Sequence, residues 1–284
     1  MRVYGIDLWS LIKGTVRKWN ADNCLRLGAS LSYYTLFSLF PLILVVLFII
    51  RLLYFNSDPA RDAILDALAN VTGGFREDFL TALEAASRTR QVSGIFGIVL
   101  LVLGASWVFG ELVSAFNIIW DVELPWGGGP FEFVRLTFSS FALMLAVAFL
   151  LLVSMIVSAV LAVIGSFLSG LPGGVLVWGG VQVILNLYVL TLIFALIFKY
   201  VPQTRVTWRD VWLGAALTAV VWSLFQLAIS YYIAFSSYKD YGAIGSILAL
   251  ITWVYLSSQI LFLGGEFTAV FARKYGSRSS KAAL

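Results

Sequence analysis

The chain has 284 residues, of which 61% are hydrophobic and only 12% are charged, with a formal net charge of +4. Soluble domains carry about 25% charged residues, so this composition excludes a soluble globular protein and predicts an integral membrane protein. The apolar runs are continuous rather than alternating, which predicts an all-α bundle of membrane-spanning helices rather than a closed barrel of strands. The chain contains no histidine and one cysteine, Cys24, which excludes a disulfide framework and any zinc or haem site with ordinary ligands.

The N-terminal segment, residues 1–27, is expected to lie at the membrane surface. Between residues 8 and 19 apolar side chains recur at helical spacing, and Lys13, Arg17 and Lys18 lie between them. This pattern is typical of an amphipathic helix in the headgroup layer. The segment contains no short apolar core followed by a small-residue cleavage site. No removable signal peptide is therefore expected, and the first membrane helix serves as the insertion signal.

Six stretches are long and apolar enough to cross a bilayer, which takes about 20 residues in a helix. They cover residues 28–53, 94–118, 134–166, 174–199, 211–236 and 243–271. Between the first two lies the insert 54–93, where Asp58 followed by Pro59 is typical of a helix start. We therefore predict one six-helix membrane domain over residues 1–284, with short helices in the insert.

The distribution of positive charge predicts the orientation of the six helices. Most of the 19 lysines and arginines fall in the N-terminal segment, in the connector near residue 205 and in the basic tail 272–284, all on one side. Because positively charged segments stay in the cytoplasm, both termini are expected there and the insert 54–93 is expected outside. The connector 121–133 is acidic although this assignment makes it cytoplasmic, but acidic residues contribute little to the rule.

Four segments occur in a characteristic order: ASLSYYTLFSLFPL from residue 29, SAFNIIWDV from residue 114, and the runs 199–235 and 241–269. Together they closely resemble the YihY/BrkB family of bacterial inner-membrane proteins, over most of the chain. The resemblance implies six helices with both termini in the cytoplasm. The activity of the family is poorly defined: transport has been suggested for it, and some members carry a ribonuclease BN-like label. Family members have a basic connector after the second helix, and the acidic one here departs from that pattern.

A polar stripe runs along the first predicted span. In a helix, Ser30, Tyr34, Ser38 and Pro41 fall on one face. Pro41 cannot donate a backbone hydrogen bond, so it is expected to kink the helix and to serve as a hinge. Hydrocarbon offers no partner for hydroxyls or for a freed carbonyl. The stripe must therefore face inward, either to hydrogen-bond with neighbouring helices or to line a polar cavity.

Further polar side chains lie on the later spans at helical spacing. Gln182 and Asn186 share a face of the fourth span, and Gln226 lies on the fifth. Tyr255 and Gln259 share a face of the sixth. Amides at mid-bilayer depth are costly unless they are paired, so these side chains either pair with one another or line a pathway. The candidate lining of a polar cavity is Tyr34, Ser38, Gln182, Asn186, Gln226, Tyr255 and Gln259.

Glu111 and Glu266 are the two carboxylates inside the predicted spans, and acids within a membrane are candidates for a function. Their positions along the helices place both near the cytoplasmic headgroups. One interpretation is a structural belt of ion pairs with the basic residues at that level, which are Arg135, Lys199 and Arg273. The other interpretation is a carboxylate that couples transport to a proton or acts as a gate.

An enzyme is not expected. Nuclease or hydrolase chemistry needs metal-binding carboxylates, a histidine base or an activated nucleophile, and the sequence offers no such cluster, metal site or cofactor site. We therefore regard the ribonuclease label as unsupported by these residues. The positive charge is concentrated in the cytoplasmic tails, where attraction to anionic membrane lipids explains it without a nucleic acid.

Two functional hypotheses follow from the sequence. The first is a multi-pass protein of the bacterial inner membrane that transports or handles a lipid or envelope precursor in a polar cavity, an amphipathic cargo being favoured because the cavity holds few charges. The alternative is a structural protein that does not transport and that binds an envelope partner through the insert 54–93. The sequence leaves the cargo, the source of energy and the formation of a homo-oligomer open.

Overall fold

The structure, a computed structural model, describes residues 2–3, 6–53, 95–122, 174–235 and 242–279. The predicted third span 134–166, the insert 54–93 and Arg135 lie outside these residues. The same holds for most of the acidic connector, of which Asp121 and Val122 are described.

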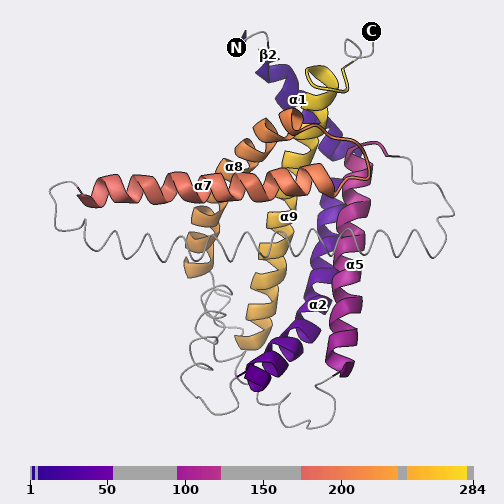
Figure 1. Cartoon of the computed structure of the whole chain (residues 1–284), viewed down its shortest axis with the longest axis vertical. Coiled ribbons are helices and arrows are strands. Elements are labelled where there is room, and N and C mark those ends of the chain that lie inside the picture. Colours follow the sequence, from indigo (N-terminus) through magenta and orange to yellow (C-terminus); the bar gives the residue numbers. More distant parts are fainter. Residues whose placement is uncertain (1, 4–5, 54–94, 123–173, 236–241, 280–284) are drawn as a thin grey trace. The chain divides into compact units, whose positions relative to one another are not determined.

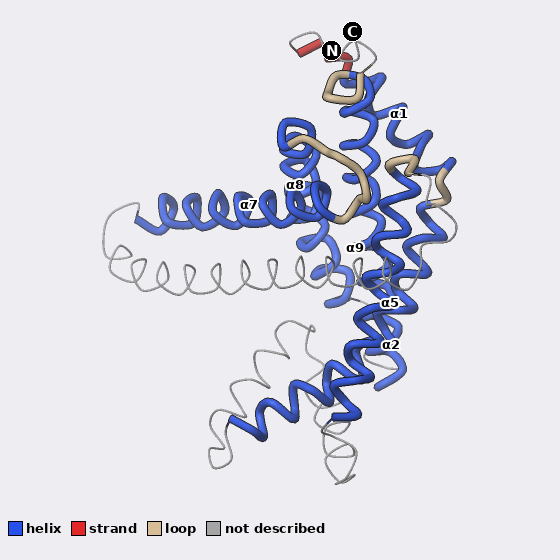
Figure 2. The backbone as a smooth tube through the Cα atoms, turned by 45° about the vertical axis from the view of Figure 1, so that its right-hand side comes forward, coloured by secondary structure: helices blue, strands red, loops and turns tan. Residues whose placement is uncertain are grey.

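The described part of the chain consists of helices, the turns and loops that join them, and one antiparallel hairpin of two strands with two residues each (Figures 1 and 2). This confirms the predicted all-α class, while the hairpin was not predicted. The elements are β1 (Arg2–Val3), β2 (Ile6–Asp7), α1 (Leu8–Ala21), α2 (Cys24–Leu53), α5 (Ile95–Ile119), α7 (Gly174–Tyr200), α8 (Trp208–Phe235) and α9 (Gly242–Lys274).

Each described helix matches a range expected from hydropathy to within a few residues. The segments Gly179–Tyr200, Trp208–Ile229 and Ile247–Lys274 are long and apolar enough to cross a membrane. The remaining spans and the side on which each terminus lies stay predictions. Asp7 caps α1, because its side chain accepts a hydrogen bond from the Ser10 backbone amide at 3.4 Å.

The chain divides into two compact units, each of which we describe by itself. The first unit draws on residues 1–27, 112–227 and 259–284, and the second on residues 28–111 and 228–258. The helices α2, α5, α8 and α9 each contribute residues to both units.

Aromatic and aliphatic side chains form the core of the first unit. The Phe116 ring of α5 lies 5.8 Å from the Phe198 ring of α7 and 6.1 Å from the Phe262 ring of α9, measured between centroids. All three side chains are fully buried. At the N-terminal end, Leu11 of α1 packs against Phe267 of α9. The amphipathic helix predicted from the sequence is therefore docked on α9 through Leu11, while the apolar side chains of Ile12 and Val16 are 52% and 51% exposed.

Two reciprocal glycine–threonine contacts join α8 and α9 within the first unit. A side-chain carbon added to Gly214 would overlap the Thr268 hydroxyl, and one added to Gly264 would overlap the Thr218 hydroxyl. Each threonine donates its hydroxyl to a carbonyl one turn back in its own helix, at 2.7 Å in both cases. Small residues at a crossing let helix backbones approach closely, which stabilises packing where hydrocarbon gives no hydrophobic drive.

A buried aspartate fixes the end of α9 to the start of α8. The Asp210 carboxylate accepts hydrogen bonds from the Thr207 hydroxyl at 2.6 Å and from the Ser277 backbone amide at 3.1 Å. It also accepts one from the Ser277 hydroxyl. Only 2% of Asp210 is exposed, so the carboxylate replaces lost hydration with these donors.

In the second unit, several hydroxyl groups of α2 bond within their own helix. Ser32 donates to the Gly28 carbonyl, and Thr35 donates to the Leu31 carbonyl, both at 2.7 Å. The helix continues through Pro41 to Leu53, so the proline does not end it. The predicted hinge at Pro41 stays a prediction.

Candidate functional site

The polar face of α7 is exposed. Gln182 and Asn186 lie one turn apart within the candidate span Gly179–Tyr200, and both are exposed. They lie among exposed apolar side chains, of which Val183 is 59% and Ile184 is 70% exposed. Neither amide makes a hydrogen bond to another residue that the structure describes. The pairing between amides that the sequence allowed is therefore not formed by these two side chains within the described part of the chain.

The other candidate lining residues divide between the two units. Gln226 is exposed on the part of α8 that belongs to the first unit, and Gln259 is half-buried on α9 in the same unit. In the second unit, Tyr34, Ser38 and Tyr255 are half-buried. A single cavity lined by all seven residues stays a prediction.

In the second unit, two of these residues have local hydrogen bonds. Ser38 donates to the Thr35 carbonyl at 2.8 Å, and the Tyr255 carbonyl accepts from Ser258 at 2.7 Å. Both bonds lie within a single helix. They satisfy polar groups without tying one helix to another.

Glu266 is the most deeply buried acid of the described residues in the membrane spans. Its side chain is 0% exposed, and the Cys24 thiol donates to its Oε1 atom at 3.8 Å, a weak hydrogen bond. The Oε2 atom is buried without a hydrogen-bond partner among the described residues. Gln259, two turns earlier on α9, donates to the Cys24 carbonyl at 3.3 Å.

The basic residues near Glu266 pair with other acids. Lys18 lies 3.1 Å from an Asp22 oxygen and 2.8 Å from an Asp121 oxygen, and Arg273 lies 2.9 Å from the second Asp121 oxygen. Partial burial tends to lower the pKa of Lys18, but its hydrogen bonds to Asp121 and Asp22 outweigh that effect and raise the pKa above its usual value. A belt of ion pairs is therefore present, and its acids are Asp22 and Asp121.

The residues that the sequence predicted for an ion-pair belt have other surroundings in the structure. Among the described residues, neither Glu111 nor Glu266 takes part in a salt bridge. Glu111 is half-buried in the second unit. Lys199 donates to the Val206 carbonyl and lies 5.8 Å from the centre of the Trp208 ring.

Sequence reasoning missed Asp22 and Asp121 as parts of this cluster. The acidity of the connector that begins at Asp121 was visible, but the two basic residues that it meets come from distant parts of the chain. The described residues hold no group of three or more His, Cys, Asp or Glu side chains placed to bind a metal ion. Chemically, the buried Glu266 carboxyl can exchange a proton or accept hydrogen bonds from a polar ligand.

Long apolar helices, one of which buries a carboxyl, define a helical membrane protein. The family model described as virulence factor BrkB matches residues 15–283, so the chain belongs to the BrkB family. This confirms the resemblance of its sequence segments to that family.

Three relatives show how the similarity is distributed. Ribonuclease-like protein YfkH of Bacillus subtilis is 27% identical over 87% of this chain and 90% of its own length. A UPF0761 membrane protein of Teredinibacter turnerae is 28% identical over 99% of this chain and 64% of its own length. Another, from Tolumonas auensis, is 29% identical over 89% of this chain and 82% of its own length. No solved structure matches the chain.

Proposed function

We propose that this protein works in the bacterial inner membrane as a transporter or lipid-handling protein that moves or presents an amphipathic cargo, such as a phospholipid or envelope precursor. The exposed amides of Gln182 and Asn186 on α7 carry the proposal. Hydrocarbon cannot hydrogen-bond an amide, so an amide exposed within a span needs a polar cargo group or water. Both side chains recur on one face, which gives a cargo headgroup successive partners along the helix.

We further propose that the protein is not an enzyme. The ribonuclease-like name belongs to YfkH and describes no chemistry of this chain. Hydrolysis of a nucleic acid needs a bound metal or a positioned general base; the sequence contains no histidine, and the described residues hold no group of three or more His, Cys, Asp or Glu placed to bind a metal.

The test is a lipid-translocation assay with the purified full-length protein in vesicles. The probes are phosphatidylethanolamine and phosphatidylglycerol with a fluorescent headgroup label, and a membrane-impermeant quencher reports the fraction that has crossed. The double variant Gln182→Leu, Asn186→Leu should lower the rate by about tenfold, because a lost hydrogen bond to a polar group is worth about one decade. The control is Val183→Leu, which also introduces leucine at an exposed position of α7 but removes no amide. This variant should keep the wild-type rate.

Equal rates for the double variant and the wild type would refute the role of the α7 amides. The alternative function as a partner-binding envelope protein depends on the insert 54–93, which lies outside the described residues. Deleting that insert separates the two proposals, since a transporter lacking it should still move lipid. If the protein instead works by binding a partner, deletion of the insert should abolish its function in cells. The α7 double variant should then retain that function.

A further inference from the structure

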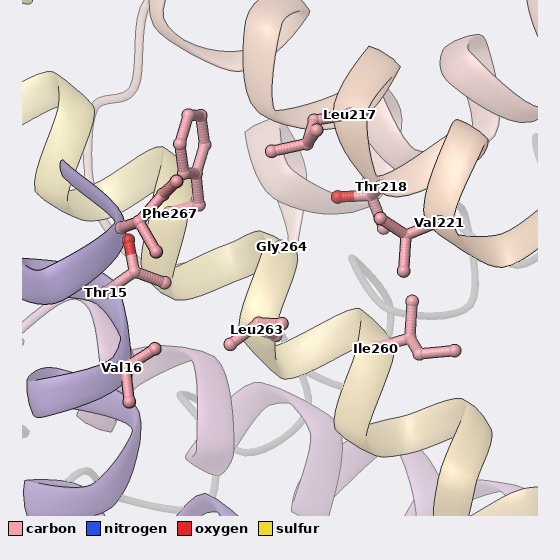
Figure 3. Close-up of a pocket in the computed structure, with 10 residues that line it drawn as sticks. Thr15, Val16, Leu217, Thr218, Val221, Ile260, Leu263, Gly264 and Phe267 are labelled. Carbon is pink, nitrogen blue, oxygen red and sulfur yellow. The ribbon is translucent and has the colours of Figure 1, made fainter. Parts of the chain in front are cut away.

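An apolar pocket of about 120 Å³ lies between α1, α8 and α9 in the first unit. Figure 3 shows Thr15 and Val16 of α1 on one side, Leu217 and Val221 of α8 on the other, and α9 running between them. Leu263 of α9 lies between the two walls. The pocket is partly open, and none of the predicted cavity residues lines it.

The walls of this pocket offer no unpaired polar group. Its two hydroxyl side chains, Thr15 and Thr218, donate to carbonyls of their own helices at 2.9 Å and 2.7 Å. An apolar cavity of about 150 Å³ holds a benzene molecule and stays free of water, so a pocket of this size fits a short segment of hydrocarbon chain. The chemistry of the walls selects an alkyl group rather than a polar ligand.

The position of the pocket along α8 matches the depth of an acyl chain. Exposed aromatic side chains mark the start of α8: Trp208 and Trp212 are each 40% exposed, and Trp208 packs against Tyr200 at 6.1 Å between ring centroids. Such aromatic groups favour the headgroup level. At 1.5 Å per residue, Leu217 lies about 13 Å further along the helix, which is within the hydrocarbon layer.

Two basic residues of α1 directly follow residues that line the pocket. Ile12 and Val16 line the pocket, and the next residue after each is basic: Lys13 and Arg17. Both basic side chains are exposed, and neither forms a salt bridge with another described residue. They lie one turn apart on a helix that docks against α9 through Leu11. A phosphate held by these two cations would leave an acyl chain free to enter the neighbouring pocket.

We propose that this pocket binds one acyl chain of an anionic phospholipid whose phosphate contacts Lys13 and Arg17. The site lies apart from the α7 amides, and the inference does not rest on the proposed function. The proposal concerns lipid binding at equilibrium, so a negative result in a transport assay would not contradict it. Two cations near a lipid surface give a preference for an anionic headgroup on the order of tenfold.

The experiment measures lipid retention by native mass spectrometry of the full-length protein in gentle detergent. The protein is titrated with phosphatidylglycerol or with phosphatidylcholine that carries the same acyl chains. The wild type should retain one phosphatidylglycerol molecule about tenfold more tightly than phosphatidylcholine. Equal retention of the two lipids would overturn the proposal without any variant, because it would show an unselective annular lipid.

Two pairs of variants then test the two halves of the site. Val221→Trp fills the pocket and should abolish the selective retention, while Val220→Trp, at an exposed neighbour that does not line the pocket, should keep it. The double change Lys13→Gln, Arg17→Gln should remove the preference for phosphatidylglycerol. The matched control Arg26→Gln, Arg205→Gln removes the same charge from exposed sites and should keep the preference.

Folding of each variant is checked by its helical circular dichroism and its melting temperature, and Val221→Phe replaces Val221→Trp if the larger residue unfolds the protein. Selective retention by a folded pocket-filling variant would overturn the proposal. A fall in oligomeric mass caused by the pocket-filling change would also overturn it, since the pocket would then hold a second copy of the chain.

Discussion

The Nζ atom of Lys18 lies 2.8 Å from the Oδ1 atom of Asp121, although 103 residues separate them in the sequence. The other Asp121 oxygen lies 2.9 Å from Arg273. Asp121 lies two residues after the end of α5. Its two ion pairs therefore link this end of α5 to α1 and to the end of α9. Asp121 has a backbone φ of 50°, a conformation that aspartate and asparagine tolerate better than most residues.

Replacing this aspartate tests the linkage. Asp121→Asn keeps the unusual backbone conformation but removes both ion pairs. Because the Asp121 side chain is 57% exposed, we expect the free energy of unfolding to fall by only about 0.5 to 1 kcal/mol. Thermal unfolding in detergent measures the change. The difference from wild type should shrink in 1 M salt, and a difference that does not depend on salt would contradict an electrostatic origin.

The same linkage predicts a response to alkaline pH. The raised pKa of Lys18 means that its contribution is fully present below the usual lysine value of 10.5 and is lost as the pH rises through the higher folded-state value. Wild-type protein should therefore lose stability above about pH 10.5 by a larger amount than Lys18→Gln does. Melting curves between pH 8 and pH 11.5 would show this, and parallel losses in the two proteins would contradict it.

The contact between α8 and α9 predicts intolerance of a single methyl group. Gly214→Ala should lower the free energy of unfolding by about 1 to 3 kcal/mol, because the added carbon overlaps the Thr268 hydroxyl. The control is Gly180→Ala on α7, where an added carbon meets nothing within 4 Å and should leave stability equal or slightly higher. Adding Thr268→Ala to Gly214→Ala should restore part of the loss. Without such recovery, the overlap is not the cause.

Two buried acids should differ in how much stability the protein loses when their charge is removed. Glu266→Gln should change the free energy of unfolding by less than about 1 kcal/mol, since its carboxyl has one weak donor and no described salt bridge. Asp210→Asn should cost about 1.5 to 3 kcal/mol, because that carboxylate accepts hydrogen bonds from Thr207 and Ser277. Chemical unfolding of both variants makes the comparison. A loss of about 3 to 5 kcal/mol for Glu266→Gln would instead identify a structural ion pair.

The single cysteine provides a direct probe of the Glu266 cluster. Cys24 is 0% exposed, so the folded protein in detergent should react with a maleimide at least about 100-fold more slowly than the unfolded chain. Mass spectrometry of the intact protein follows the reaction. Gln259→Ala removes a hydrogen bond to the Cys24 carbonyl and should speed labelling, whereas Gln182→Ala on exposed α7 should not. Rapid labelling of the folded wild type would show that the cluster is open.

Hydropathy was sufficient to locate the described helices, because a bilayer span requires a long apolar run and nothing else in this chain produces one. The amphipathic pattern of residues 8–19 likewise predicted α1, whose apolar Leu11 is buried against α9. The partners of charged residues were not predictable in the same way. Glu266 meets Cys24, 242 residues away, and no local pattern records which helices come together.

The close contact of α8 and α9 did leave a signal that was overlooked. Both segments place a threonine four residues after a glycine, in GAALT from Gly214 and GGEFT from Gly264. Small residues at this spacing are typical of helix crossings in membranes. Both motifs are visible in the sequence, but the register of the helix crossing depends on tertiary packing.

These reciprocal contacts also limit how the protein can move. In a shear motion, packed helices slip past each other by a fraction of a turn. Here such slippage would drive each threonine into the backbone of the opposite helix, because Gly214 and Gly264 leave no spare room. The segments 208–227 of α8 and 259–274 of α9 are therefore expected to move together as one rigid body. Any conformational change of the first unit has to pivot around these two packed segments rather than shear between them.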